Sequence, residues 1–319
     1  MAKSEKQKKN RRHYRKPQRE RSRNCAETRT RECPSYDPQY FRMIFTIPDD
    51  EYLPDWNEIS CLIGTMEDTE ADKSCPDTDF CFENVSTGAK AYFRGYKPDG
   101  ESDFGLVMEV PLPHARCLAY EIFPLAVKIA RHFSLQIKYC CPDGSWKALK
   151  GSVEDIMDAW QPQNEAAWEA KYESGEPLTI KASSLEAVWE FSLLRDTLER
   201  RYEREGCSVL EVEYLRRRKT GEILRSCTWN AADPAVFPPV DIVKLEHPPK
   251  PLRDGKLYDA ETFFKSLKPW IKNIPAPISH KLYIKHDDSA DMLDKIASLK
   301  GTIMRSYEPV SACSLKDID

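Results

Sequence analysis

Residues 118–139 read LAYEIFPLAVKIARHFSLQIKY, and the hydrophobic period changes part-way along this stretch. In its first part, apolar residues recur every three or four positions, namely Leu118, Ile122, Leu125, Ile129 and Phe133. This spacing places one apolar stripe on a helix, which Pro124 either starts or bends. Residues 135–139 then alternate between apolar and polar, as in a strand. The stretch predicts a helix that leads directly into a strand.

The segments before this stretch predict three more strands and another helix. Residues 41–47 form an apolar run typical of a buried strand. Apolar residues at helical spacing within residues 56–63 predict a short helix. Residues 89–96 and 104–110 predict a hairpin, because a Pro-Asp-Gly turn lies between them. The order strand, helix, strand, strand, helix, strand over residues 41–140 is that of the split βαβ arrangement in ferredoxin-like folds.

A polar linker, residues 172–182, is predicted to precede a second α+β part. Before this linker, residues 152–168 fit a helix whose first residue, a serine, is placed to cap it. After it, Ser183 and Glu186 have the spacing of a capping box, which predicts a helix running to about Glu205. The remaining expected elements are a hairpin at 209–215 and 223–229, strands at 240–245 and 282–285, and helices at 259–270 and 290–299.

A chain of 319 residues with 40% hydrophobic content is long enough for two domains, each with its own core. The expected fold class is α+β: two mixed α/β domains, the first of them ferredoxin-like, behind a disordered basic N-terminal arm. The predicted boundaries are the arm 1–38, the ferredoxin-like domain with its C-terminal helix 39–171, the linker 172–182, the second domain 183–300 and a loose tail 301–319. Tryptophans expected in the two cores are Trp160, Trp168, Trp189 and Trp270.

The charge is divided unevenly along the chain. Residues 1–32 carry thirteen Lys/Arg against four Asp/Glu, a net +9, whereas the remaining residues carry 35 against 48, a net −13. The arm contains no Val, Ile, Leu or Phe, so it cannot bury enough apolar surface to fold alone. Cationic segments bind phosphate backbones by releasing counterions. The residues predicted to contact RNA or DNA are Lys8, Lys9, Arg11, Arg12, Tyr14, Arg15, Lys16, Arg19, Arg21 and Arg23.

Two other interpretations of the arm remain open at this point. It could fold back onto the protein's own acidic surface, for which residues 67–79 are a candidate with six carboxylates against one lysine. It could also be a solubilising leader without a binding role. The acidic stretch lacks the residue order of a calcium-binding loop, so we expect a solvated loop there.

Several features favour a cytoplasmic protein. The eleven cysteines lack the regular spacing of a disulfide framework, so reduced thiols are expected. No apolar run follows the basic N-terminus as it would in a secretory signal. No stretch approaches the roughly 18 apolar residues of a membrane helix, so no membrane association is expected.

The motifs of common enzyme classes are missing. There is no Cys-x-x-Cys pair, no Gly-x-Ser-x-Gly elbow and no glycine-rich phosphate loop, so neither a metal nor a cofactor is expected. The best catalytic candidates are Glu211, Glu213, Asp241 and Lys244, whose carboxylates could hold Mg²⁺ for phosphodiester cleavage. Strand alternation places Glu211 and Glu213 on one face, which is more simply a solvent-facing side.

These observations favour a noncatalytic binding or adaptor protein whose acidic folded body recognises a protein partner. One alternative is a nucleic-acid- or ribosome-associated protein tethered by its basic arm, and another is a metal-dependent phosphodiesterase or nuclease. The first alternative predicts salt-sensitive binding that depends on the arm. The second predicts a Mg²⁺-dependent activity that Glu211→Gln or Asp241→Asn removes. The sequence leaves the oligomeric state undefined.

Overall fold

We analysed a computed structural model of the protein. The structure describes residues 35–47, 54, 56–71, 79–96, 105–172, 177–231, 233–250, 252–275, 281–283 and 289–319. Contacts divide the chain into two units, Met1–Arg31 and Glu32–Asp319. All the described residues belong to the second unit, so the arm residues predicted to bind nucleic acid lie outside them.

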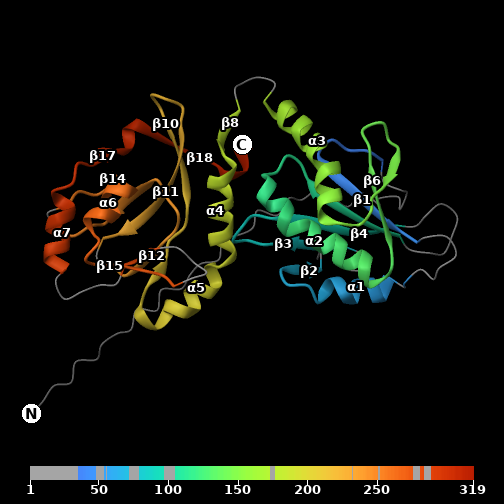
Figure 1. Ribbon diagram of the computed structural model, residues 1–319, viewed down its shortest axis with the longest axis horizontal. Coiled ribbons are helices and arrows are strands. Elements are labelled where there is room, and N and C mark those ends of the chain that lie inside the picture. Colours follow the sequence, from blue (N-terminus) through green and yellow to red (C-terminus); the bar gives the residue numbers. More distant parts are fainter. Residues whose placement is uncertain are drawn as a thin grey trace, which may run out of the picture. The chain divides into compact units, whose positions relative to one another are not determined.

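Seven strands form the first sheet, in the order β2-β3-β4-β5-β1-β6-β7 (Figure 1). They are β1 (Tyr40–Thr46), β2 (Thr69–Ala71), β3 (Asp79–Glu83), β4 (Lys90–Tyr96), β5 (Gly105–Pro111), β6 (Gln136–Cys140) and β7 (Trp146–Ala148). Strand β1 is antiparallel to both of its neighbours, with Met43 opposite Met108 of β5 and Tyr139 of β6. Strands β4 and β5 are also antiparallel, as the predicted hairpin requires.

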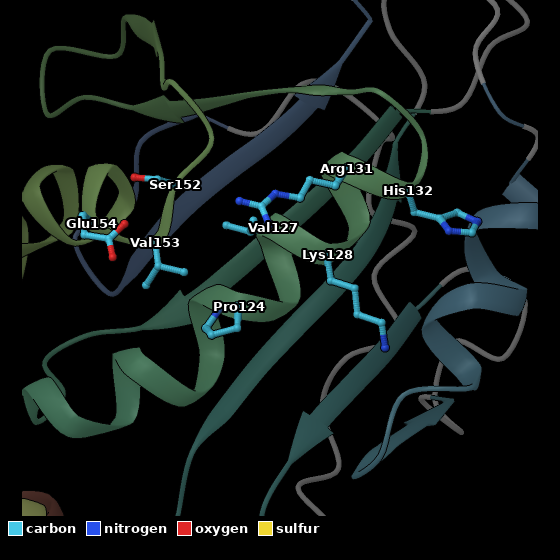
Figure 2. Close-up of a pocket in the computed structure, with 8 residues that line it drawn as sticks. All are labelled: Pro124, Val127, Lys128, Arg131, His132, Ser152, Val153 and Glu154. Carbon is cyan, nitrogen blue, oxygen red and sulfur yellow. The ribbon is translucent and has the colours of Figure 1, made fainter.

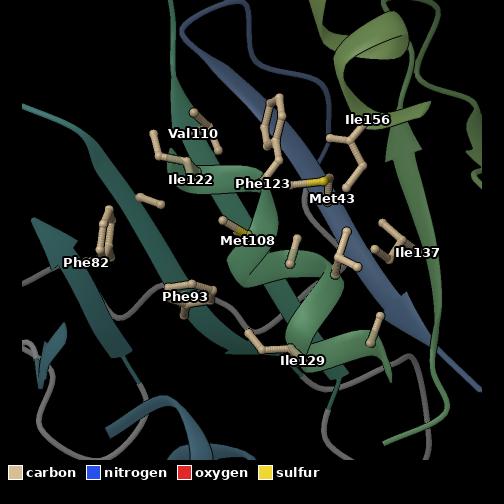
Figure 3. Packing of buried hydrophobic residues seen from close by; sticks show 14 of the residues in the cluster. Met43, Phe82, Phe93, Met108, Val110, Ile122, Phe123, Ile129, Ile137 and Ile156 are labelled. Atoms are coloured by element: carbon tan, nitrogen blue, oxygen red, sulfur yellow. The ribbon is translucent and has the colours of Figure 1, made fainter. Parts of the chain in front are cut away.

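Helices pack against one face of this sheet. They are α1 (Trp56–Gly64), α2 (Arg116–His132) and α3 (Val153–Lys171). Figure 3 shows Phe123 of α2 beside Met43 of β1 and Ile156 of α3. The rings of Phe123 and Trp160 meet edge to face at 5.9 Å between centroids. The apolar stripe read from the sequence of α2 is therefore the side of the helix that fills this core.

The N-terminus of α3 confirms the predicted cap. The Ser152 hydroxyl accepts a hydrogen bond from the backbone N–H of Asp155 at 3.1 Å. Two acidic residues follow in the first turn, Glu154 and Asp155, where they complement the helix dipole. The serine therefore sets where α3 begins.

The second half contains a six-stranded sheet with the order β17-β14-β13-β11-β10-β18. Its strands are β10 (Glu213–Arg217), β11 (Ile223–Asn230), β13 (Ile242–Glu246), β14 (Lys256–Asp259), β17 (Thr302–Ile303) and β18 (Tyr307–Val310). The predicted hairpin is present, with Leu215 of β10 opposite Leu224 of β11. The core beside it contains Trp229, whose ring lies 5.4 Å from that of Phe237 and 5.8 Å from that of Phe263.

Smaller elements complete the described part of the chain. A four-stranded sheet has the order β15-β16-β12-β9, and β19 pairs with β8 in a two-stranded sheet. These strands are β8 (Leu178–Lys181), β9 (Ser208–Val209), β12 (Ala235–Phe237), β15 (Ile271–Asn273), β16 (Lys281–Tyr283) and β19 (Leu315–Ile318). The other helices are α4 (Ala182–Leu193), α5 (Arg195–Tyr202), α6 (Ala260–Ser266) and α7 (Ser289–Ala297), with 3₁₀ turns at Glu203–Glu205, Met304–Ser306 and Ala312–Ser314. The protein is thus a mixed α+β structure.

Two local expectations for the second half differ from the structure. Helix α4 begins at Ala182, so Ser183 lies within its first turn and no side chain caps the helix. The single helix expected to reach Glu205 is interrupted at Leu194, which ends α4 and precedes α5. The capping-box spacing is present in the sequence, but the helix begins directly after β8, with Lys181 at the N-cap position, two residues before the serine that was expected there.

The segment expected to be a loose tail forms strands. Within it, β18 pairs with β10 at the edge of the six-stranded sheet, and Tyr307 of β18 is buried there. Strand β19 pairs in parallel with β8, which lies inside the segment expected to be a linker, and Leu178 stands opposite Leu315. Both strands have four residues, too few for a periodic pattern to be seen in the sequence.

No helix within the described ranges is long and apolar enough to cross a membrane. All eight cysteines that the structure describes are free thiols. No disulfide bond therefore involves any of these eight positions.

Candidate ligand-binding pocket

The described residues form a pocket of about 740 Å³, here called the main pocket. Natural ligand sites typically measure about 300–1,000 Å³. Its walls come from the turn between β3 and β4, the start of α2, helices α4 and α5, the residues leading into β10, and the C-terminal segment. The apolar side chains that line it are Leu118, Leu185, Val188, Trp189, Phe191, Leu210, Val212 and Leu315.

A buried amide fixes the wall just before α2. The backbone N–H of His114 donates to Asn164 Oδ1 at 2.8 Å, and Asn164 Nδ2 donates to the His114 carbonyl at 2.9 Å. Asn164 lies on α3 and is 4% exposed, so this paired contact satisfies both of its polar ends. The two hydrogen bonds hold the entry to α2 against α3.

The C-terminal segment fixes the same wall from another side. Helix α2 follows Ala115, which has no side chain that could cap it. In place of a local cap, Asp317 Oδ2 accepts a hydrogen bond from the backbone N–H of Arg116 at 2.9 Å. Lys316 pairs with Glu165 of α3. Strand β19 therefore contacts both the start of α2 and helix α3, and Asp317 lies 201 positions from Arg116 in the chain.

The ionisable groups that line the interior are held uncharged. Burial lowers the pKa of His114 to about 4, with a smaller contribution from Lys171. Burial likewise raises the pKa of the Cys117 thiol to about 12, assisted by Asp317, and raises the pKa of Tyr214. At neutral pH these three side chains are a neutral imidazole, a thiol and a phenol. The interior thus favours apolar, uncharged groups.

The rim of the pocket is acidic. Arg195 is paired with Glu199 at 3.0 Å and with Glu211 at 2.8 Å, so its charge is already compensated. Asp196 adds a third carboxylate to the lining. The pKa of Asp68 is raised by burial and then by nearby carboxylates, which include Asp196. The rim therefore attracts a positive group.

Glu121 links two walls of the pocket. Its two carboxylate oxygens accept hydrogen bonds from the Trp189 indole N–H at 2.9 Å and from Asn84 Nδ2 at 2.7 Å. These partners lie on α4 and just after β3. Trp189, expected in a core, packs against a buried cluster that includes Leu185 and also lines the pocket, with its indole nitrogen fixed.

Two residues of the lining carry buried hydrogen-bonding atoms without a partner. His114 Nε2 and Trp168 Nε1 are both closed off from solvent and have no hydrogen-bond partner among the described residues. Both residues belong to the pocket lining. A buried polar atom without a partner costs roughly 1–3 kcal/mol.

The carboxylates predicted to hold Mg²⁺ are engaged elsewhere. Asp241 accepts three hydrogen bonds from Arg225, from its backbone N–H at 2.9 Å, Nε at 3.0 Å and Nη2 at 2.7 Å. Glu211 precedes β10 and pairs with Arg195 at the rim of the main pocket. Glu213 lies on β10, where its Oε2 is 3.5 Å from the hydroxyl of Thr228.

Lys244, the fourth predicted residue, lies on β13, half-buried and opposite Thr228 of β11. No group of three or more His, Cys, Asp or Glu side chains that could hold a metal ion occurs among the residues that the structure describes. Of the four predicted residues, Glu211 alone belongs to the lining of the main pocket.

A second, shallower pocket of about 600 Å³, here called the side pocket, lies where α2 ends and α3 begins (Figure 2). Arg131 extends toward the start of α3, whereas Lys128 and His132 point away from it. Glu154 is the one carboxylate in its lining, and hydrogen bonds from its own backbone N–H and from Ser152 lower its pKa. That carboxylate already occupies the N-terminus of α3.

No family of proteins matches this chain, and neither the curated proteins nor the solved structures contain a significant match to it. The assignment of function consequently depends on the chemistry of the pockets and surfaces of this chain alone. The lining of the main pocket extends from Val85 to Leu315 along the chain, and nothing in the local sequence of these residues marks them as neighbours.

Proposed function

We propose that the protein is a noncatalytic binding or adaptor protein, and that its acidic body recognises a short apolar and basic segment of a protein partner in the main pocket. The observation that carries this proposal is the combination of an apolar interior, in which His114, Cys117 and Tyr214 are kept uncharged, with a rim of carboxylates. An apolar side chain fits the first part and a neighbouring lysine or arginine fits the second.

The same features argue against acid–base or nucleophilic chemistry in this pocket. A general base functions best with a pKa near the working pH, and the pKa of His114 lies far below it. A nucleophilic cysteine needs a lowered pKa, whereas that of Cys117 is raised.

Two finer features of the fold and location belong to this proposal. We infer that the first sheet has the ferredoxin-like arrangement, supported by the order β4-β5-β1-β6 with antiparallel neighbours. We also infer two domains and a cytoplasmic location, the latter supported by the eight free thiols.

The proposal is tested with two synthetic peptides that share the same apolar residues, one carrying Arg and Lys and the other Asp and Glu. Their binding to the full chain is measured by isothermal titration calorimetry. We expect the basic peptide to bind and the acidic peptide not to bind. Equal affinity for the two peptides would overturn the proposal.

A charge-reversal pair locates the binding. Glu199→Lys with Glu211→Lys should weaken the basic peptide at least about tenfold, equivalent to roughly 1.4 kcal/mol. The matched control, Asp158→Lys with Asp294→Lys, makes the same charge change on exposed positions of α3 and α7 outside the pocket lining. An equal loss in both double variants would show that the net charge, and not the rim, attracts the peptide, and would reject the assignment.

A further inference from the structure

A basic segment interrupts the acidic body. Residues 128–150 contain five Lys/Arg and one Asp, a net +4, although residues 33–319 as a whole carry −13. The cations are Lys128, Arg131, Lys138, Lys147 and Lys150. The sequence pattern alone spreads them over a helix, a strand and a loop, so their common position becomes evident only in the fold.

The fold brings two of these cations into one pocket lining, where their side chains point in different directions, and two more lie close to that lining along the chain. Lys128 and Arg131 lie on the last turns of α2 and line the side pocket together with Ser152 (Figure 2). Lys150 comes two residues before Ser152, and Lys147 lies on β7, the strand that leads to it. All four of these cations are exposed. We call Lys128, Arg131, Lys147 and Lys150 the basic surface.

The basic surface is distinguished by its lack of ion pairs among the described residues. None of its four side chains takes part in an ion pair with any residue that the structure describes. The other basic run of the body, residues 216–219, differs in this respect: two of its arginines pair with Glu308 and a third pairs with Glu222. Two carboxylates nevertheless lie near the basic surface without forming an ion pair with it. They are Glu154 in the side pocket and Asp143, whose pKa is lowered first by hydrogen bonds from Ser145 and further by Lys147.

Some of these residues also have structural roles, and these roles leave their charges available to a ligand. Arg131 at the end of α2 complements the helix dipole, and Lys147 on the edge strand β7 discourages pairing with another sheet. Both roles leave the cation facing solvent. Glu154 is the opposing feature, because its carboxylate lies within the side pocket.

We propose that the basic surface binds the phosphate backbone of a single nucleic-acid strand. The cations are exposed and distributed over α2, β7 and the loop before α3, which suits several phosphates in a row better than one enclosed anion. Because α3's own N-terminus is already occupied by Glu154, the contacts come from the side chains. This surface shares no residue with the main pocket, so the two assignments succeed or fail separately.

Lysine footprinting on the full chain tests the surface directly. The protein is acetylated briefly with and without an oligouridylate of about 20 nucleotides, longer than the site of a typical single-strand-binding fold. Acetylation at each lysine is then measured by mass spectrometry. We expect the oligouridylate to reduce the acetylation of Lys128, Lys147 and Lys150 severalfold and to leave that of the exposed Lys265 unchanged. Unchanged acetylation of all three lysines would overturn the proposal.

Salt dependence of binding supplies an independent measurement. Each phosphate contact contributes about 0.7 to the slope of log affinity against log salt for a single strand. Reversing Lys128 and Lys150 to Glu should therefore reduce the slope by about 1.4, and the affinity at low salt at least about tenfold. The arm is present in every protein compared, so its own contribution cancels.

The matched control is Arg218→Glu with Lys219→Glu, which makes the same charge change at the tip of the β10–β11 hairpin. We expect it to change the slope much less. Equal losses in both double variants would show that only the net charge matters and would reject the basic surface. Glu154→Gln should act in the opposite direction and strengthen binding, and weaker binding in that variant would equally reject the assignment.

Discussion

Replacing Asp317 by alanine tests whether the C-terminal segment caps α2. The wild-type carboxylate accepts the Arg116 backbone N–H at 2.9 Å, and the residue before the helix, Ala115, provides no cap of its own. Loss of an N-cap side chain typically costs about 1 kcal/mol, and loss of an anion near a helix N-terminus about 0.3–1 kcal/mol more. We therefore expect Asp317→Ala to lower the free energy of unfolding by about 1–2 kcal/mol.

The assay is urea unfolding followed by tryptophan fluorescence, with the free energy extrapolated to water. Asp319→Ala is the matched control, because its carboxylate lies in the same segment, 3.8 Å from Arg116 Nη1, but its side chain is 96% exposed. Such exposed pairs usually contribute little, so the control should unfold like the wild type. Asp317→Asn keeps an oxygen acceptor, so its free energy of unfolding should lie between those of Asp317→Ala and Asp319→Ala.

The reasoning would be refuted if Asp317→Ala and Asp319→Ala had the same free energy of unfolding. Such a result would mean that water satisfies the α2 terminus as well as the carboxylate does. A change in the urea dependence without a change in midpoint would point instead to a different denatured state.

Three further predictions concern single side chains. The pKa of His114 is about 4 in the folded protein and about 6.5 in the unfolded chain. Its contribution to stability is therefore complete above about pH 6.5 and is lost as the pH falls toward 4. The wild type should lose unfolding free energy between about pH 7 and 4.5, and in His114→Gln this loss should be smaller by roughly 2 kcal/mol. The exposed Cys313 should react with iodoacetamide well before Cys117, whose pKa of about 12 keeps it protonated, as peptide mass spectrometry would show. Asp241→Asn should destabilise the protein by about 1–3 kcal/mol in urea unfolding, because it weakens three hydrogen bonds from Arg225.

A different result would contradict each of these three predictions. A His114→Gln variant with unchanged pH dependence would assign the acid sensitivity to other groups. Labelling of Cys117 as fast as Cys313 would show that the main pocket opens in solution. An Asp241→Asn variant of normal stability that lost a Mg²⁺-dependent phosphodiesterase activity would favour catalysis over the structural role.

Much of the first sheet could be predicted because its elements are long and strongly periodic. The apolar stripe on α2, the apolar run in β1 and the serine cap at Ser152 can each be recognised in a short stretch of sequence. The second half was harder, because Ser183 and Glu186 have a capping spacing that the adjacent strand β8 overrides. A prediction from local sequence fails where contacts with other parts of the fold determine the backbone conformation.

The main pocket could not be predicted from the sequence, for a related reason. Its α2 wall is fixed by Asn164 and by Asp317, partners that lie 50 and 201 positions away. Neither residue differs locally from an ordinary polar surface residue. The helical spacing of Trp189 predicts a place in a core, and Trp189 does pack against a buried cluster; that it also lines a pocket, with its indole bound to Glu121, is evident only in three dimensions.

The C-terminal segment connects the stability of the fold with the proposed binding. Leu315 lines the main pocket, and Asp317, two residues later, holds the start of α2, which forms another wall. A change at Asp317 should therefore weaken the basic peptide as well as the fold, whereas charge reversal at Lys128 and Lys150 should leave both unchanged. Ligand binding in the pocket should in turn stabilise the protein by mass action, and Asp317→Ala should recover part of its lost stability in excess peptide. If the peptide stabilised the wild type and this variant without binding more weakly to the variant, the pocket wall would be independent of the α2 cap.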